Sequence, residues 1–334
     1  MPDTASPQRI VRPRVIVTRE LADSVHDRMA ELFDVVPNLD DHAFSRDEMM
    51  AAMADCDVLV PTVTDRIDAD MINAAPDRLR MIANFGAGVD HIDLAAAHSR
   101  RIVVTNTPGV FTEDTADMTM ALILSVPRRL AEGEKLMRSG QWEGWKPGGM
   151  LGHCIGGKTL GIIGMGRIGQ AVARRASGFG LSIRYHNRRR LPPALEQSLN
   201  ASFVEERDEL IAQSDILTLH CPYTPQTNRM IDAHAIGLMR PTSYLINTAR
   251  GDLIDEDALI EALQNRLIGG AGLDVYRHEP AVDPRLLALN NVVLLPHMGS
   301  ATFEGRAASG ERVIANIRFW ADGHRPPDQV LTLD

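Results

Sequence analysis

Short apolar runs alternate with longer segments of helical spacing along most of the chain. In the first third, the runs that predict strands are Val15–Thr18, Asp57–Val60, Met81–Asn84 and Ile102–Thr105. Between them, Glu20–Phe33 and Arg46–Ala54 repeat their apolar positions at helical intervals. A strand that is apolar on both faces has to be covered on both faces, so this alternation predicts a parallel β-sheet between two layers of helices.

A second series of the same kind follows one long helix-like segment. Residues 113–139 are rich in Met, Ala and Leu, and Pro127 should kink or interrupt the helix that they predict, because proline removes a backbone donor. The strands predicted after it are Thr159–Ile163, Ser182–Tyr185, Asp215–Leu219, Tyr244–Asn247, Gly270–Val275 and Val292–Leu295. A last helix over residues 303–320 is long enough to return to the first domain.

The expected fold class is therefore α/β, with two doubly wound parallel-sheet domains of the Rossmann-like or flavodoxin-like kind. Two domains are expected because 334 residues exceed what one core usually supports. A substrate domain would comprise residues 1–110 and 301–334, and a dinucleotide-binding domain residues 111–300. Hinges are expected near residues 108–112 and 298–302, with the active site in the cleft between the domains.

Composition and charge exclude several classes of function. Apolar residues make up 44% of the chain, and no apolar run reaches the roughly 18 residues that span a bilayer. Residues 1–14 are polar, which predicts a short loose tail rather than a secretory signal. A net charge of −9 argues against a nucleic-acid partner. The widely spaced Cys56, Cys154 and Cys221 fit no disulfide framework or metal site and favour the reducing cytoplasm.

The strongest local motif is a glycine-rich turn. Gly164-Met-Gly166-Arg-Ile-Gly169 follows an apolar strand and opens a helix expected over residues 170–178. In that context, glycines permit a tight turn and close approach of a pyrophosphate, which the helix N-terminus attracts. The motif predicts a dinucleotide site, and a merely tight turn is the less favoured interpretation.

The end of the next predicted strand bears on which dinucleotide binds. An Asp or Glu about 20 residues after the glycines would bind the ribose 2′-hydroxyl of NAD and repel a 2′-phosphate. Asn187 stands there instead, followed by Arg188, Arg189 and Arg190. Guanidinium groups match phosphate in shape and charge, so NADP(H) is favoured over NAD(H). A solvated basic turn, with NAD(H) as cofactor, stays open.

Three further segments place polar groups directly after predicted strands, where open parallel sheets bind ligands. These segments are Asn247–Asp255, Gly272–Pro280 and Leu295–Thr302. They contribute Arg250, Glu279 and His297. The Arg can bind a carboxylate and polarise a neighbouring carbonyl, while the His, held by the Glu, can donate a proton to the developing alkoxide. A cofactor would supply the hydride, so the set predicts reduction of a 2-keto acid.

These motifs resemble those of the D-isomer-specific 2-hydroxyacid dehydrogenase family, and within it the glyoxylate/hydroxypyruvate reductase branch. The resemblance runs from about Asp57 to about Asn316. Its most specific segments are Asn84–Asp90, Thr159–Gln170, Ile246–Asp255, Gly272–Pro280 and Pro296–Thr302. Several such motifs in the family's order are hard to obtain by chance.

The resemblance implies roles for individual residues. Arg250 matches the family's substrate-binding arginine, and Glu279 with His297 its proton-transfer pair. Ala87 and Gly88 match the turn whose backbone N–H groups hold the substrate carboxylate. The cofactor-binding residues that it implies are Thr115, Gly164, Gly166, Arg167, Ile168, Gly169, Asn187, Arg188, Arg189, Cys221, Pro222, Thr227, Thr248, Ala249, Asp274, His297 and Gly299. Asp274 would lie near the nicotinamide carboxamide, and no metal is implied.

The segment after Glu113 resembles the family's dimerisation arm, so a homodimer is expected. Trp142 matches an aromatic residue that in the glyoxylate reductase branch can reach the partner's active site, so it is a candidate for substrate binding there. Packing within the dimer interface is an equal alternative, because aromatic residues are enriched at interfaces in general. Pro127 departs from the family pattern and leaves the straightness of the arm open.

The expected function is NADPH-dependent reduction of a small 2-keto acid, such as glyoxylate or hydroxypyruvate, to the D-2-hydroxy acid. A small substrate is favoured because no further basic cluster stands near Gly86–Asp90. Two alternatives stay open. One is NAD-linked oxidation of D-glycerate, D-lactate or phosphite. The other is a nucleotide-sensing interaction protein like the family's corepressors, which the complete Arg–Glu–His set disfavours.

Overall fold

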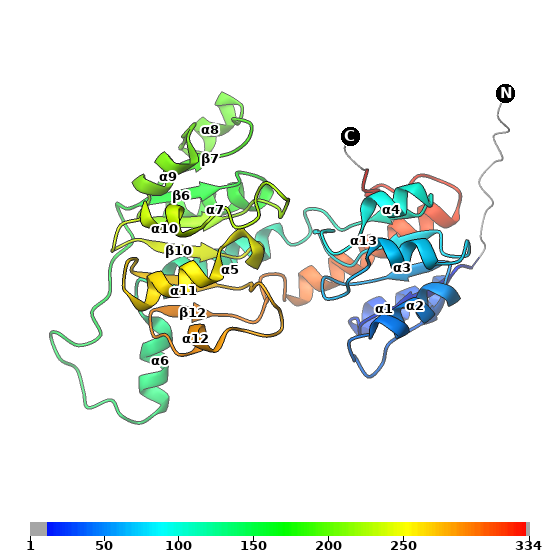
Figure 1. Cartoon of the computed structure of the whole chain (residues 1–334), viewed down its shortest axis with the longest axis horizontal. Helices are drawn as coiled ribbons and strands as arrows, with labels where there is room; N and C mark the ends of the chain where they lie inside the picture. Colours follow the sequence, from blue (N-terminus) through cyan, green and yellow to red (C-terminus); the bar gives the residue numbers. More distant parts are fainter. Residues whose placement is uncertain (1–11, 332–334) are drawn as a thin grey trace. The chain divides into compact units, whose positions relative to one another are not determined.

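The computed structural model describes residues 12–331, which fold into two compact units (Figure 1). The first unit comprises residues 12–111 and 301–331, and the second unit comprises Thr112–Ser300. Most of the tail expected over residues 1–14 lies outside the described residues. At its end that expectation is wrong, because Arg14 begins the first strand and pairs with Asp34.

The first unit is a five-stranded parallel sheet with helices on both faces. Its elements are β1 (Arg14–Val17), α1 (Asp23–Leu32), β2 (Asp34–Val36), α2 (Arg46–Asp55), β3 (Val58–Val60), α3 (Ala69–Ala74), β4 (Met81–Ala83), α4 (Leu94–Ser99), β5 (Val103–Thr105) and α13 (Phe303–Ala321). The strand order β2-β1-β3-β4-β5 is that of flavodoxin-like sheets. Ser45, Asp68 and Asp93 cap α2, α3 and α4 by accepting a backbone N–H three residues further on.

Alternating side chains of the central strands bury both faces of this sheet. Leu59 of β3 belongs to the cluster under α2, α3 and α4, whereas its neighbour Val58 belongs to the cluster under α1 and α13. The two helices of the second cluster approach closely, since a Cβ at Gly310 would lie 2.3 Å from a methyl carbon of Val25. The continuous apolar runs of the sequence therefore mark strands that are covered on both sides.

The second unit is a seven-stranded parallel sheet, again with helices on both faces. Its elements are α5 (Thr112–Ser125), α6 (Leu130–Arg138), β6 (Thr159–Ile163), α7 (Arg167–Gly178), β7 (Ser182–His186), α8 (Pro193–Leu199), β8 (Ala201–Phe203), α9 (Arg207–Gln213), β9 (Ile216–Leu219), α10 (Ala233–Gly237), β10 (Tyr244–Asn247), the 3-10 helix η1 (Gly251–Leu253), α11 (Glu256–Gln264), β11 (Gly270–Leu273), α12 (Pro284–Leu287) and β12 (Val292–Leu294). The order β12-β11-β10-β9-β6-β7-β8 reverses between β6 and β9, as in Rossmann folds.

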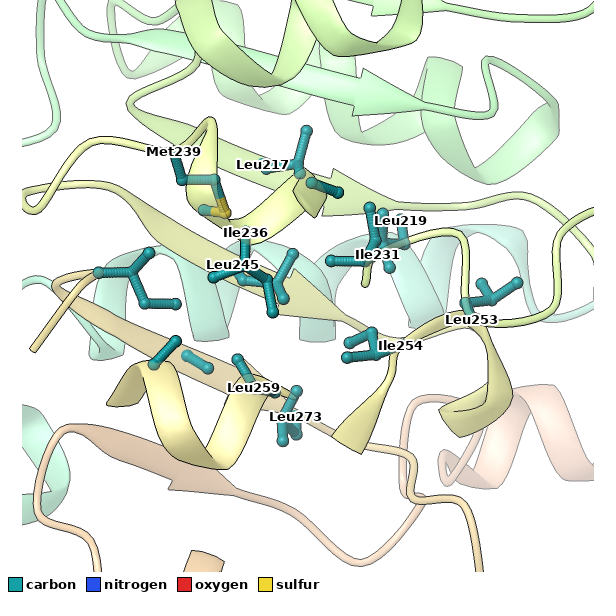
Figure 2. Packing of buried hydrophobic residues seen from close by; sticks show 14 of the residues in the cluster. Leu217, Leu219, Ile231, Ile236, Met239, Leu245, Leu253, Ile254, Leu259 and Leu273 are labelled. Carbon is teal, nitrogen blue, oxygen red and sulfur yellow. The ribbon is translucent and has the colours of Figure 1, made fainter. Parts of the chain in front are cut away.

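One face of this sheet is packed by the side chains shown in Figure 2. Leu217, Leu245 and Leu273 come from the neighbouring strands β9, β10 and β11, and they meet Ile236 of α10 and Leu259 of α11. All five side chains are at most 3% exposed. The opposite face carries a separate apolar cluster beneath α5 and α7. The two clusters together hold the strands of the second unit between two layers of helices.

The predicted strands are confirmed with end positions that differ by one or two residues, but two strands were missed. These are β2 and β8, each three residues long at the edge of its sheet. Both are only partly buried. An edge strand needs less apolar covering than a central one, so its sequence lacks the continuous run that marks the others.

The expected effect of Pro127 is confirmed. Helix α5 ends at Ser125 and α6 begins at Leu130, with Arg129 between them in the left-handed region at φ 55°. The Pro127 carbonyl accepts a hydrogen bond from the N–H of His153 instead of continuing a helix. The segment after Glu113 is therefore two helices rather than one.

Within residues 12–331, no helix is long and apolar enough to cross a membrane. Cys56, Cys154 and Cys221 are all free thiols. Burial raises the pKa of Cys56 to about 12 and that of Cys221 to about 11, so both thiols stay protonated and unreactive near neutral pH. The cytoplasmic location inferred from cysteine spacing stays a prediction.

Candidate active site

The glycine-rich turn joins β6 to α7 at the point where the strand order reverses. Gly164 has φ +97°, and a Cβ there would lie 2.5 Å from the backbone nitrogen of Cys221. A Cβ at Gly169 would lie 2.3 Å from the Gly164 carbonyl oxygen. At Gly166, by contrast, a Cβ would meet nothing within 4 Å. The first and third glycines are required by packing, and the second leaves open space.

This open space lies at the N-terminus of α7, a helix of 12 residues. Its N-cap, Gly166, offers no side-chain acceptor, and its first turn, which includes Arg167 and Ile168, holds no acidic residue. The first N–H groups of a helix and its dipole attract an anion. A pyrophosphate therefore fits this turn both sterically and electrostatically.

Arg190, the third arginine after β7, is committed to the protein itself. Its guanidinium donates to both carboxylate oxygens of Glu196, at 3.0 and 2.9 Å, and lies over the ring of Phe203. Glu196 is only 8% exposed and also accepts a hydrogen bond of 2.6 Å from the Tyr185 hydroxyl. The Arg190 partner holds the pKa of Glu196 below its usual value. The sequence pattern did not separate this structural arginine from its neighbours.

Arg188 and Arg189 differ from Arg190. Both are exposed, and within residues 12–331 neither guanidinium makes a hydrogen bond or an ion pair. The turn that carries them is braced from within, because the side chain of Asn187 donates to the Arg189 carbonyl at 3.0 Å. Two of the three arginines are thus available to a ligand.

A buried asparagine shapes the turn after β10 that carries Arg250. The side chain of Asn247 donates to the Arg250 carbonyl at 2.8 Å and accepts from the N–H of Ala249 at 3.0 Å. The next residue, Gly251, touches the segment after β11, since a Cβ there would lie 2.1 Å from the carbonyl carbon of Tyr276. Backbone contact therefore sets the spacing between these two segments.

Glu279 and His297 form a hydrogen-bonded pair. Nδ1 of His297 lies 2.6 Å from one carboxylate oxygen of Glu279, and the other oxygen accepts the Tyr276 N–H at 2.9 Å. Burial raises the pKa of Glu279, but the hydrogen bond and charge of His297 outweigh it, and the charge of Arg250 adds to them. The net effect is a pKa below the usual value, so Glu279 is a carboxylate that orients the imidazole and leaves Nε2 for proton transfer.

Asp274 holds the backbone that follows His297. Its two carboxylate oxygens accept the N–H groups of Met298 at 2.8 Å and Gly299 at 2.7 Å. Burial raises the pKa of Asp274 although both hydrogen bonds favour the charged form. His297 itself has φ 52°, a left-handed conformation that such a clamp helps to maintain. Sequence reasoning missed this positioning role, and the expected role near a nicotinamide stays a prediction.

The remaining residues that were predicted for the site lie in several different segments of the chain. Thr248 is hydrogen-bonded to Thr119 at 2.8 Å, and Thr119 in turn donates to the Thr115 carbonyl. The Thr227 hydroxyl donates to the carbonyl of Pro222 in the loop after β9. Ala87 and Gly88 belong to the first unit, and Trp142 follows α6 and is exposed. Within residues 12–331, no group of three His, Cys, Asp or Glu side chains could hold a metal ion.

A Rossmann-ordered sheet with a glycine turn at its reversal and an Arg–Glu–His set at its strand ends defines the class of protein as a nicotinamide-dependent oxidoreductase. Residues 120–299 match the model of the D-isomer specific 2-hydroxyacid dehydrogenase NAD binding domain. Glyoxylate reductases of Thermococcus onnurineus and Pyrococcus furiosus are each 42% identical to the chain over 324 residues, which is 96% of either partner. The chain belongs to the D-isomer-specific 2-hydroxyacid dehydrogenase family, in its glyoxylate reductase branch.

Solved structures agree with this assignment. A glyoxylate reductase from Paecilomyes thermophila superposes with a TM-score of 0.85 at 33% identity, covering 96% of this chain and 99% of that one. The NADPH-dependent glyoxylate/hydroxypyruvate reductase of Sinorhizobium meliloti, in complex with NADP and malonate, gives 0.83 at 34% identity, covering 96% and 97%. The predicted family and fold class are confirmed, and the protein is an NAD(P)-dependent oxidoreductase.

The close contact between Gly251 and Tyr276 can be tested by substitution. Gly251→Ala should lower kcat/KM for 2-keto acid reduction at least about tenfold, because the new methyl group pushes apart the segments that carry Arg250 and Glu279. Gly237→Ala, where a Cβ meets nothing within 4 Å, is the matched control and should leave kcat/KM unchanged. Steady-state kinetics on folded variants checks both, and a Gly251→Ala value within about threefold of wild type would contradict the prediction.

Proposed function

We propose that this protein reduces small 2-keto acids, glyoxylate and hydroxypyruvate foremost, to D-2-hydroxy acids with NADPH as the preferred reductant. The observation that carries the proposal is the 2.6 Å Glu279–His297 contact, with Arg250 on the neighbouring strand end. The glyoxylate reductases similar to this chain support the substrate class, and the NADPH-dependent enzyme of Sinorhizobium meliloti supports the cofactor.

Each residue of the set has a distinct task in such a reduction. The bound nicotinamide supplies the hydride to the carbonyl carbon. Arg250 binds the carboxylate of the keto acid and polarises its carbonyl. His297 donates the proton from Nε2 to the carbonyl oxygen as negative charge develops there, and Glu279 stabilises the imidazolium before that transfer.

The role of the pair is tested by His297→Ala and Glu279→Gln. With NADPH and glyoxylate, hydroxypyruvate, pyruvate or a bulkier 2-keto acid, His297→Ala should lower kcat about 100-fold or more, because the general acid is lost. Glu279→Gln should lower kcat/KM about tenfold, because Nδ1 of His297 loses the carboxylate that orients the ring. His278→Ala, an exposed neighbour of Glu279, is the control and should change neither quantity.

The outcomes separate the function from the residue roles. If the wild-type protein oxidises NADPH with none of the four acids, the proposed function is refuted, and a nucleotide-sensing role gains weight. If the wild-type protein is active and His297→Ala keeps kcat within about threefold, only the role of His297 is refuted.

The cofactor preference rests on the turn after β7. The exposed guanidinium groups of Arg188 and Arg189 are available for a 2′-phosphate, and no Asp or Glu stands at Asn187 to repel it. Arg190 is excluded from this role, because Glu196 and Phe203 already hold its guanidinium.

Two arginine variants test this assignment against each other. Arg188→Ala should raise the KM for NADPH about tenfold and leave that for NADH nearly unchanged, because only the phosphate contact is lost. Arg190→Ala should lower the Tm, because it leaves the buried Glu196 carboxylate without its cation, and should preserve the ratio of kcat/KM values for the two cofactors. Equal losses for NADPH and NADH in Arg188→Ala would refute phosphate binding at this turn.

The proposed partner is a second copy of this chain. Helix α6 and the loop after it extend away from the sheet of the second unit (Figure 1). This arm exposes large apolar side chains, namely Leu130, Met137, Trp142, Trp145 and Leu151, each more than half exposed. Such a concentration of apolar surface is typical of an interface. The role of Trp142 in a partner's substrate site stays a prediction.

Sedimentation velocity tests the dimer. The wild-type protein should sediment as a homodimer, and Trp145→Glu should shift it toward monomer, because the 81% exposed indole would be buried between copies. Leu267→Glu, at a 53% exposed position outside the arm, is the control and should keep the dimer. A monomeric wild-type protein would refute this part of the proposal.

A further inference from the structure

A fully buried asparagine organises the loop after β4 in the first unit. Asn84 donates both of its side-chain N–H groups, one to the carbonyl of Gly86 at 3.0 Å and one to the carbonyl of Gly88 at 2.8 Å. Its side-chain oxygen lies 3.0 Å from Nε2 of His91. Because both N–H groups face carbonyl oxygens, the amide cannot be flipped, and Nε2 of His91 is the donor in the third contact.

A second amide completes the same arrangement from the next strand. Asn106, directly after β5, donates its side-chain N–H to the carbonyl of Ala87 at 2.7 Å. The N–H of Thr107 donates to the carbonyl of Gly86 at 3.0 Å. Asn106 is itself held, since its carbonyl accepts the side chain of Asn316 in α13. The carbonyl groups of three successive loop residues thus face the side chains of Asn84 and Asn106.

The direction of these carbonyls determines the direction of the N–H groups. In a planar trans peptide, the carbonyl of one residue and the N–H of the next point in opposite directions. Fixing the carbonyls of Gly86 and Ala87 on the asparagines therefore aims the N–H groups of Ala87 and Gly88 away from them. Within residues 12–331, neither N–H has an acceptor. Adjacent N–H groups held in this way form an anion-binding site.

We propose that Asn84 and Asn106 are positioning residues for the substrate carboxylate. They touch no substrate themselves. By holding the carbonyl side of the loop, they keep the N–H groups of Ala87 and Gly88 oriented before the keto acid arrives, so that binding does not have to order a glycine-containing loop. This inference rests on the proposed function. It gives Asn84 and Asn106, which lie outside the Arg–Glu–His set, a part in the preference for substrates that carry a carboxylate.

The experiment compares a 2-keto acid with its uncharged amide, pyruvate against pyruvamide, with NADPH. The quantity measured is the ratio of the two kcat/KM values. Asn106→Ala and Asn84→Asp should each lower this ratio roughly tenfold by raising the KM for pyruvate, because a loosened loop loses its selective contact with the carboxylate. The KM for NADPH should stay unchanged. Asn73→Ala, an exposed position at α3 of the same unit, is the control.

The possible results are distinct. Wild-type preference for pyruvate with an unchanged ratio in the folded variants would overturn the inference and leave the proposed function intact. Equal losses for acid and amide would also overturn it, because they would indicate general damage to the fold. If Asn84→Asp fails to fold, Asn106→Ala alone tests the inference, because Asn106 is only half-buried. If the wild-type protein reduces neither compound, the proposed function fails, and the inference fails with it.

Discussion

Parallel strands that are buried on both faces leave little room for polar chemistry except at their carboxyl ends. In the second unit, apolar clusters cover both faces of the sheet, and every residue of the Arg–Glu–His set follows a strand. The same holds for the glycine turn after β6 and, in the first unit, for the loop after β4. The burial that stabilises the sheets therefore also decides where a ligand can bind.

Buried polar side chains convert these strand ends into defined loops. Asn84, Asn247 and Asp274 lie at or directly after a strand, and none is more than 1% exposed. Each uses its side chain to bind the backbone of the loop that follows it or lies beside it. A buried amide or carboxylate without partners would be costly, so the loop conformation that satisfies it is strongly favoured. The backbone next to His297 is ordered in this way, because Asp274 binds the N–H groups of Met298 and Gly299.

Close contact between backbone segments also positions the loops at the strand ends, at places where any side chain would be too large. The turn at Gly164 meets the segment after β9, and Gly251 meets the segment after β11, at distances that exclude a Cβ. Gly299 lies against a side chain instead, since a Cβ there would be 2.9 Å from a carboxylate oxygen of Asp274. The segments after β6 and β9, and those after β10 and β11, are thereby in contact without side chains between them, which permits a compact arrangement of charged groups.

The sequence by itself determined the family, the interruption at Pro127 and all strands of the two sheets except β2 and β8, and it singled out Arg250, Glu279 and His297 as candidates for the site. These results follow from apolar runs, from the inability of proline to continue a helix, and from the order of the motifs, all of which can be read along the chain. Only the tertiary structure decided that Arg190 is held by Glu196 and Phe203 while Arg188 is available, that Asp274 clamps the residues after His297, and that Asn106 serves the loop after β4. The physical reason is that a polar side chain's role depends on which backbone groups and charges the fold brings to it, and edge strands such as β8 likewise depend on a neighbour rather than on their own pattern.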